Sequence, residues 1–276
     1  MSVDAARRSH GPAEVVATRP RVPRSVNPSS LPALYRAQVD PEESWARALR
    51  EAARSGAKFG WRTLRRASQR ADLKRLAGEE QRAQLILGAG HQRRPGWLST
   101  DILPRGLDIL YLDISKRFPF PDASVRRIYA EHVIEHVSLE HAENMLSESF
   151  RVLEPGGQIR IATPDLAQMG RLMQPLDDRA ERYVRESNAM FLSGRPDLLG
   201  EPVVAVNRMF RCYGHQFLYD ETFLCRLLED RGFTNVVRCP VGESADEVFV
   251  GMEEHGRHIG EFCNRFETLL LEAARP

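Results

Sequence analysis

The 276-residue sequence has no long apolar run, which excludes a membrane span of the usual kind. Such a span needs about 18 consecutive apolar residues. The arginines among the first twenty residues are not followed by the apolar core of a secretory signal, so we expect a chain that is not exported. Cysteine is scarce, with four residues spaced 13, 14 and 24 apart and no CxxC pair. This spacing argues against a zinc knuckle and a disulfide framework, and the expected compartment is a reducing cytoplasm.

The net charge of +1 hides an asymmetry along the chain. Residues 1–82 carry a net charge of +8 and the remainder carries −7. Residues 1–32 are polar, with five prolines and no apolar periodicity, which predicts disorder. Residues 33–80 show a rough helical spacing of apolar residues and are rich in arginine, which predicts a basic helical arm. Such an arm would suit peripheral contact with an anionic membrane, or it would be the solvated face of a helix packed on the main domain.

From about residue 81 onwards, short apolar runs alternate with helical patterns. The expected strands are 84–87, 97–102, 107–114, 127–130, 158–163, 235–239 and 267–273, and the clearest helices are 139–153 and 220–231. This alternation predicts an α/β fold, a Rossmann-like, mostly parallel, seven-stranded sheet with helices on both faces. Ligands of such sheets bind beyond the carboxyl ends of the strands, so functional residues are expected there.

The first three strands each end in residues suited to ligand binding. Gly88-Ala89-Gly90 follows the first strand, and its glycines permit a tight turn that brings backbone N–H groups close to a ligand. Asp101, followed by Ile102, ends the second strand, and its carboxylate can accept hydrogen bonds from two ribose hydroxyls. Asp113, followed by Ile114, ends the third and can accept from an adenine amine. Each signal is weak when taken alone.

The ordered string of motifs is more specific than its parts. It contains Gly88-x-Gly90, Gly96-Trp97-x-x-x-Asp101, Asp113, Phe118-Pro119-Phe120-Pro121-Asp122, Glu131-His132-x-x-Glu135-His136 and Arg151-Val152-Leu153-x-Pro155-Gly156-Gly157. This string resembles the class I S-adenosylmethionine (SAM)-dependent methyltransferases, in particular a branch similar to methyltransferase type 11 with a PGW segment after the glycine loop. The resemblance covers residues 84–165 and resumes at 213–220 and in the final strand.

The resemblance implies SAM as the cofactor and a domain spanning residues 81–276. By the same resemblance, Gly88, Ala89 and Gly90 would cradle the methionine part of SAM, Asp101 with Ile102 would bind the ribose, Asp113 with Ile114 would frame the adenine, and Glu131 would lie near the amino-acid end.

Two departures from the family pattern stand out. Ile86 occupies a position where the family often has an acidic residue, which removes one expected link to the SAM ammonium. The connection from Gly90 to Trp97 is also too short for a crossover helix, because parallel strands usually need about a dozen residues between them. We therefore expect the first helix to be lost or reduced to a turn.

The expected reaction is in-line transfer of the methyl group to a nucleophile, with a general base taking the proton of a hydroxyl acceptor. The candidate bases are His132, Asp165 and His215. Asp165 has the alternative role of capping the next helix, and His215 that of a buried, hydrogen-bonded histidine. An insertion at about 166–215 is expected to form a lid. Its arginines would recognise a phosphate or carboxylate, or would simply solvate a helical hairpin.

The expected acceptor is a sugar or lipid-linked glycan, by family association, or another small molecule. No aromatic stacking platform accompanies the basic arm, which argues against nucleic acid. His132-Val133-Ile134-Glu135-His136 also matches a zinc-protease pattern, but it directly follows a short strand, and we predict no metal. Two other functions compete. One is a catalytically silent SAM-binding or scaffold protein, suggested by Ile86. The other is a nicotinamide-dependent enzyme, opposed by the missing third glycine and the lack of a Tyr-x-x-x-Lys pair.

Overall fold

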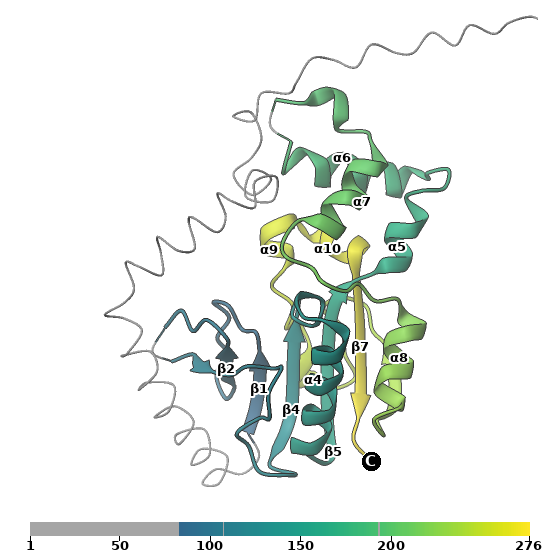
Figure 1. The fold of residues 1–276 in the computed structure, drawn as a ribbon. Coiled ribbons are helices and arrows are strands. Elements are labelled where there is room, and N and C mark those ends of the chain that lie inside the picture. Colours follow the sequence, from purple (N-terminus) through teal and green to yellow (C-terminus); the bar gives the residue numbers. More distant parts are fainter. Residues whose placement is uncertain (1–82, 107, 193) are drawn as a thin grey trace, which may run out of the picture. The chain divides into compact units, whose positions relative to one another are not determined.

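The computed structural model describes residues 83–106, 108–192 and 194–276. They form a seven-stranded sheet of order β3-β2-β1-β4-β5-β7-β6, in which β7 alone runs antiparallel to its neighbours (Figure 1). The strands are β1 (Ala83–Leu87), β2 (Leu98–Asp101), β3 (Leu110–Tyr111), β4 (Val125–Glu131), β5 (Leu153–Pro164), β6 (Thr234–Arg238) and β7 (Thr268–Ala274). The Rossmann-like sheet predicted from the sequence is therefore confirmed. The predicted disorder of 1–32 and the predicted arm at 33–80 lie outside the described residues.

The connection from β1 to β2 contains turns and no helix. The two strands are parallel neighbours, with Leu85 opposite Leu98, so the short connection crosses over without room for a helix. The loss of the first helix, expected from the sequence, is confirmed. The carboxyl end of β1 consequently lacks the helix that would otherwise follow it directly.

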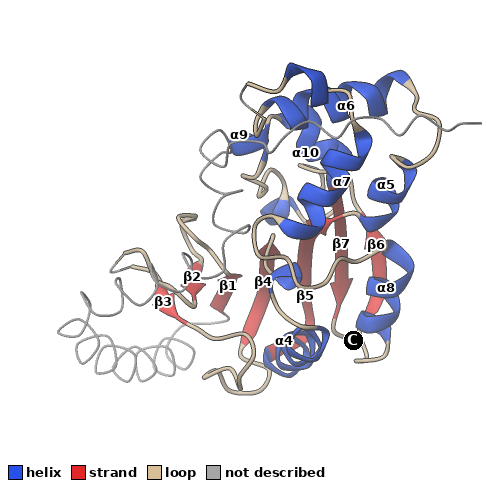
Figure 2. Ribbon diagram, turned by 45° about the horizontal axis from the view of Figure 1, so that its top comes forward, coloured by secondary structure: helices blue, strands red, loops and turns tan. Residues whose placement is uncertain are grey.

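Helices α4 (Leu139–Val152) and α8 (Glu221–Glu229) pack together on one face of the sheet (Figure 2). Alternate strand side chains, such as Leu85, Ile128 and Ile159, are fully buried in the same core cluster as the apolar faces of these two helices. On this face of the sheet, helices cover the strands as the sequence predicted. On the opposite face, within the described residues, Phe249 of the short helix η4 (Glu247–Phe249) covers β1 and β4 from a loop.

Arg160 of β5 ties that loop to the sheet. Its side chain is fully buried, and its Nε donates to Glu253 Oε1 at 2.7 Å, while Nη1 donates to the Glu272 carboxylate and to the Glu243 carbonyl at 2.9 Å. A buried guanidinium is tolerated only when carboxylates compensate its lost hydration. The Arg160 cluster therefore joins β5, β7 and the loop in one polar contact.

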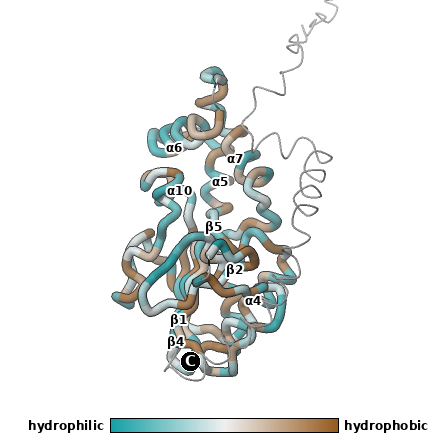
Figure 3. Tube along the Cα trace, turned by 90° about the vertical axis from the view of Figure 1, so that its left-hand side faces the viewer, coloured by the Kyte–Doolittle hydropathy of each residue, from teal (hydrophilic) through white to brown (hydrophobic). Residues whose placement is uncertain are grey.

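A group of helices lies beyond the carboxyl ends of β4 and β5 (Figures 1 and 3). It comprises α5 (Leu166–Arg171), α6 (Asp178–Ala189), η3 (Pro196–Leu198), α7 (Pro202–Arg211), α9 (Gly256–Ile259) and α10 (Glu261–Glu267). These helices have an apolar cluster of their own, in which the rings of Tyr183 and Phe266 stack at 4.3 Å. None of the helices in the described ranges is long and apolar enough to cross a membrane.

Candidate functional site

The glycine loop after β1 has a conformation that favours glycine. Gly88 and Gly90 have φ values of +60° and +55°, where a Cβ would be strained. A Cβ on Gly88 would also lie 2.4 Å from Val133 Cγ2, whereas a Cβ on Gly90 would meet no atom of the described residues within 4 Å. Gly88 is thus required by packing inside the protein, while the described part of the chain leaves space beside Gly90 for a ligand.

Asp101 holds this loop in place. Its Oδ2 accepts a hydrogen bond from the Gly90 N–H at 2.9 Å, and its Oδ1 accepts from the Leu103 N–H at 2.7 Å. An ionised carboxylate offers about four acceptor positions, so Asp101 retains capacity for hydroxyl donors. The adjacent Ile102 is 51% exposed and offers an apolar surface. Fixed backbone amides, a partly free carboxylate and an exposed apolar side chain fit the ribose and methionine portions of SAM.

The other predicted cofactor residues have specific partners. Asp113 Oδ1 accepts from the N–H and the hydroxyl of Ser115, at 3.0 and 2.7 Å, and Ile114 is buried beside it. Glu131 has contacts that the sequence did not predict. Its carboxylate accepts the backbone N–H groups of Glu254 and His255 at 2.9–3.0 Å and anchors the loop that carries His255.

A cavity of about 300 Å³ lies beyond the carboxyl ends of β4 and β5. Residues after β4 and at the end of β5 form its base, and α6, α7 and the α9–α10 region supply its walls. The lining residues are His132, His136, Pro164, Ser187, Met190, Phe191, Arg208, Met209, Tyr213, His215, His255, Ile259 and Glu267. The cavity thus brings together two of the three candidate bases, His132 and His215.

Asp165, the third candidate base, is not among the residues that line this cavity. It is fully buried, and its Oδ1 accepts from the Ala167 N–H at 2.9 Å and caps α5. Its Oδ2 accepts from Arg238 at 2.8 Å. With both oxygens engaged, Asp165 has the capping role that the sequence offered as the alternative.

His132 forms a buried pair with Glu135. The His132 Nδ1 lies 2.9 Å from Glu135 Oε1, and the Thr163 hydroxyl donates to Glu135 Oε2 at 3.1 Å. Burial alone would lower the pKa of His132, but the hydrogen bond and charge of Glu135 outweigh it and raise that pKa above its usual value. Burial likewise opposes ionisation of Glu135, yet His132 holds the Glu135 pKa below its usual value. Glu135 is therefore ionised and accepts the Nδ1 proton, while His132 Nε2 has no partner among the described residues.

His255 is the immediate neighbour of His132. The ring centroids lie 3.9 Å apart, and His255 Nε2 is 3.5 Å from Glu267 Oε1, while the Tyr183 hydroxyl donates to Glu267 Oε2 at 2.6 Å. Burial, followed by the charge of His132, lowers the pKa of His255. When the pH falls, His132 therefore takes up a proton before His255.

His215 faces the cavity from the loop after α7. Its Nδ1 lies 2.7 Å from the Met209 carbonyl, to which it donates, and burial lowers its pKa. His215 is therefore neutral, with Nε2 as an acceptor. His132 and Tyr213 have positive φ values of 51° and 69°, and both line the cavity. Such strained backbone is often concentrated at functional sites.

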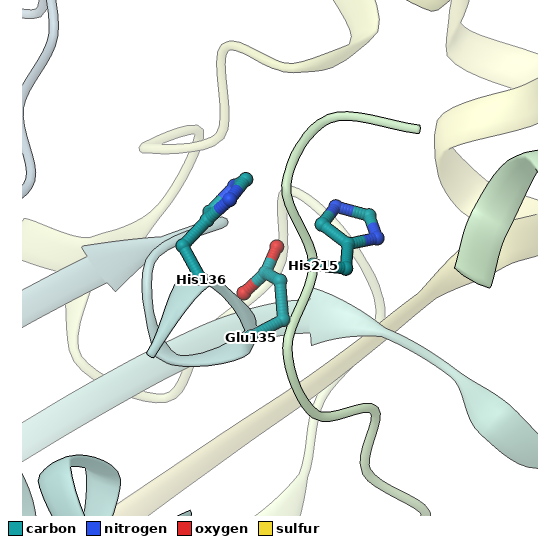
Figure 4. Close-up of side chains that lie close together, drawn as sticks. All are labelled: Glu135, His136 and His215. Carbon is teal, nitrogen blue, oxygen red and sulfur yellow. The ribbon is translucent and has the colours of Figure 1, made fainter. Parts of the chain in front are cut away.

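Glu135, His136 and His215 form a compact cluster, shown in Figure 4, whose possible ligand atoms lie within 4.8 Å of one another. These are ligand types that zinc uses. However, ligand atoms bound to tetrahedral zinc lie only about 3.3 Å apart, closer than the 4.8 Å spacing of this cluster, and each Glu135 oxygen already accepts one hydrogen bond. The zinc-protease pattern also fails locally, because a 3₁₀ turn, η2 (Ile134–His136), lies where that motif needs an α-helix. The cluster is therefore not a preformed zinc site.

Several functional groups of the cavity had not been singled out as site residues from the sequence. Arg208, His255 and Glu267 come from segments far apart in the chain and meet only through the packing of α6, α7 and α10. Glu135 was visible as part of a motif, but its role as the partner of His132 depends on the turn at η2. No sequence signal marks Glu267, which lies at the junction of α10 and β7.

Comparison with known proteins agrees with this geometry. A family model described as a methyltransferase domain matches residues 94–237, slightly more than half of the chain. A search of curated proteins found no match. Among solved structures, a SAM-dependent methyltransferase from Archaeoglobus fulgidus is 15% identical, with 76% of this chain and 94% of that chain covered and a TM-score of 0.43.

A second solved structure is Haemonchus contortus phosphoethanolamine N-methyltransferase 2, with phosphomonomethylethanolamine and S-adenosylhomocysteine bound. It is 12% identical, with 76% of this chain covered and a TM-score of 0.40. This chain spans about half of that protein, 52% of its length. The family match and the observed strand order lead to one conclusion: the chain belongs to the methyltransferase domain family, and its sheet has the strand order of the class I SAM-dependent methyltransferase fold.

Proposed function

We propose that this enzyme transfers the methyl group of SAM to a hydroxyl of a small molecule held in the 300 Å³ cavity, with His132 as the general base. The observation that carries the proposal is the His132–Glu135 pair, in which Nδ1 is held by a buried carboxylate and Nε2, a buried atom of a residue that lines the cavity, has no partner among the described residues. This is the arrangement expected of a positioned base whose orientation is set by a second group.

In this proposal the described strand ends hold the cofactor. SAM supplies an electrophilic methyl group on its sulfonium. The amides of the Gly88–Gly90 loop would face its methionine part, the free acceptor positions of Asp101 would take the ribose hydroxyls, and Asp113 with Ile114 would border the adenine. Glu131 would act through the loop it anchors. Because methyl transfer needs little covalent chemistry from the protein, alignment of donor and acceptor supplies most of the acceleration.

In its neutral form His132 has the tautomer that a base needs. Glu135 fixes the tautomer of His132 with a proton on Nδ1, so Nε2 carries the lone pair that accepts the acceptor's proton. The raised pKa of His132 makes it a stronger base than an unperturbed imidazole. His215 is the second candidate, because its neutral Nε2 belongs to another wall of the same cavity.

The cavity walls favour a compact acceptor with an apolar body. Met190, Phe191, Met209 and Ile259 contribute apolar surface, and the volume is at the lower end of the range of small-molecule pockets. A sugar ring would leave many hydroxyls without partners against these side chains. We therefore propose a small molecule rather than the sugar or lipid-linked glycan expected at first. Membrane contact and a cytoplasmic location remain predictions.

The cofactor site is tested by calorimetric titration with S-adenosylhomocysteine. Asp101→Ala should weaken binding by about tenfold or more, because two hydrogen bonds to a charged acceptor are lost. Asp230→Ala, which removes an exposed carboxylate at the C-terminal end of α8, should not change the affinity. NAD should not bind. Equal affinity in wild type and Asp101→Ala would contradict the assigned ribose site.

Turnover is tested with labelled SAM and a panel of small hydroxyl compounds. His132→Ala should lower kcat by about 100-fold or more while S-adenosylhomocysteine binding persists, because only proton transfer is lost. Cofactor binding without turnover on any compound would favour the silent SAM-binding protein instead.

We also propose that the reaction needs no metal, since the possible ligand atoms of the Glu135–His136–His215 cluster, within 4.8 Å of one another, are spaced more loosely than the about 3.3 Å between ligand atoms on tetrahedral zinc. Dialysis against EDTA should leave turnover unchanged. Loss of activity, restored by zinc or another divalent cation, would assign the Glu135–His136–His215 cluster to a metal after all.

A further inference from the structure

Arg208 is a buried cation in the wall of the cavity. It lies on α7, its exposure is 6%, and it lines the cavity together with Phe191, over whose ring its guanidinium lies at 4.7 Å. One nitrogen is committed to the protein: Nη1 donates to the Ser187 carbonyl at 2.7 Å and to Asn188 Oδ1 at 3.1 Å. These two bonds use both protons of Nη1 and fix the orientation of the guanidinium plane.

No carboxylate within the described ranges forms an ion pair with Arg208. This distinguishes it from the other deeply buried arginine, Arg160, which binds Glu253 and Glu272. An arginine stays charged under all ordinary conditions, and a buried charge without a counter-ion is costly. The unfavourable burial of this charge thus occurs at a residue that lines the cavity.

The remaining edge of Arg208 matches an oxyanion. Its Nε and Nη2 groups do not donate to a carbonyl or carboxylate of the described residues, and the Tyr213 hydroxyl, also in the cavity lining, is a hydrogen-bonding neighbour of the guanidinium. Two parallel N–H groups of this kind bind carboxylate or phosphate oxygens in a bidentate manner. Glu267 is the carboxylate of the cavity lining, but the Tyr183 hydroxyl and His255 are its partners.

We infer that the acceptor of the proposed methyl transfer carries an anionic group, a carboxylate or a phosphate, which binds to Arg208 and fixes the acceptor hydroxyl relative to His132. This inference rests on the proposed function and names the substrate class for the same cavity. A small molecule with an oxyanion at one end, an apolar body beside Phe191 and Met209, and a hydroxyl at the other end satisfies each wall of the cavity.

The test uses the full-length protein saturated with S-adenosylhomocysteine and measures the affinity of four probes by NMR titration. The probes are benzoate, its uncharged amide benzamide, phenyl phosphate and inorganic phosphate. An anionic probe should bind roughly tenfold or more tightly than benzamide, as expected for hydrogen bonds to a charged group. Preference for benzoate would assign a carboxylate, and preference for either phosphate probe would assign a phosphate.

Two variants on the same helix locate the effect. Arg208→Gln should remove the preference for anions, and Arg211→Gln, an exposed arginine one turn away, should retain it. Arg208→Lys should retain part of it, because the charge remains but the bidentate edge is lost. If Arg208→Gln does not fold, the comparison of benzoate with benzamide in the wild type still tests whether the protein prefers an anionic ligand.

Equal affinity for benzoate, phenyl phosphate and benzamide, or no binding of any anion, would overturn the inference. Because S-adenosylhomocysteine binding is measured first on the same sample, failure of the cofactor site is separate from failure of the anion site.

Discussion

Replacement of Glu135 by glutamine isolates the charge that raises the pKa of His132. Glu135 is fully buried and His132 is 13% exposed on its side chain, so little solvent screens the 2.9 Å contact. An opposite charge at this distance shifts a pKa by about 1–3 units. Because burial of His132 acts in the other direction and remains in the variant, we expect the pKa of His132 to fall below its wild-type value once the carboxylate charge is gone.

The shift can be measured without knowing the acceptor. Histidine-detected ¹⁵N NMR on protein saturated with S-adenosylhomocysteine follows each imidazole through its titration and reports its tautomer. In wild type, His132 should titrate above 6.5, the usual histidine value, with the neutral form protonated on Nδ1. In Glu135→Gln the titration should move to lower pH, and the population protonated on Nε2 should increase.

His255 provides an internal check on the same spectra. Its pKa is lowered partly by the positive charge of His132. If His132 loses its proton at lower pH in the variant, His255 should titrate at higher pH than in wild type, because the repulsion has decreased. Glu140→Gln, an exposed carboxylate on α4, should change neither titration. An unchanged or increased His132 pKa in Glu135→Gln would refute the assignment of Glu135 as the partner of a general base.

Three further predictions concern the scaffold. Arg160→Met should lower the free energy of unfolding by about 3–5 kcal/mol in urea titrations, because it leaves two buried carboxylates without their cation; a loss below 1 kcal/mol would mean that the cluster is not dry. Gly90→Ala should weaken S-adenosylhomocysteine binding and lower the free energy of unfolding by only about 1 kcal/mol, through backbone strain. Gly88→Ala should lower the free energy of unfolding further, because its Cβ would clash with Val133. Equal stability of the two variants would contradict this prediction. Glu267 has a lowered pKa, so its contribution to stability is present above about 4.5 and is lost as the pH falls; Glu267→Gln should flatten that acid loss in urea titrations between pH 3 and 6, and an unaltered slope would exclude Glu267 as a cause.

Local sequence signals predicted the sheet and the positions of the proposed cofactor residues at its strand ends. The glycines and Asp101 follow apolar runs, so their places at the ends of neighbouring strands could be predicted from spacing alone. The missing helix between β1 and β2 could likewise be predicted, because too few residues separate the two strands. Strand lengths were less accurate: β3 is only Leu110–Tyr111, and β5 extends from Leu153 to Pro164, because hydrogen bonding to neighbouring strands sets these limits.

The acceptor side could not be predicted in the same way. Arg208 was one of several arginines in a polar insertion, and no local pattern distinguishes a buried one from the exposed Arg211 three residues later. The pairing of His132 with Glu135 depends on a left-handed backbone conformation at His132, which a non-glycine residue rarely adopts. Asp165 was ambiguous for the opposite reason, since a carboxylate between a strand and a helix suits both a cap and a base.

The division of the chain around the cavity has a consequence for how this enzyme could acquire new substrates. The proposed cofactor residues follow the first three strands, whereas Arg208, Phe191 and Tyr213 come from one continuous stretch between β5 and α8. That stretch shares with α9 and α10 an apolar cluster that is separate from the core of the sheet, so its composition can change without disturbing that core. Residues 166–215 could therefore be exchanged as a single segment for the equivalent stretch of another family member. In such a chimera we expect the grafted segment to determine which acceptor binds, while this chain still binds SAM.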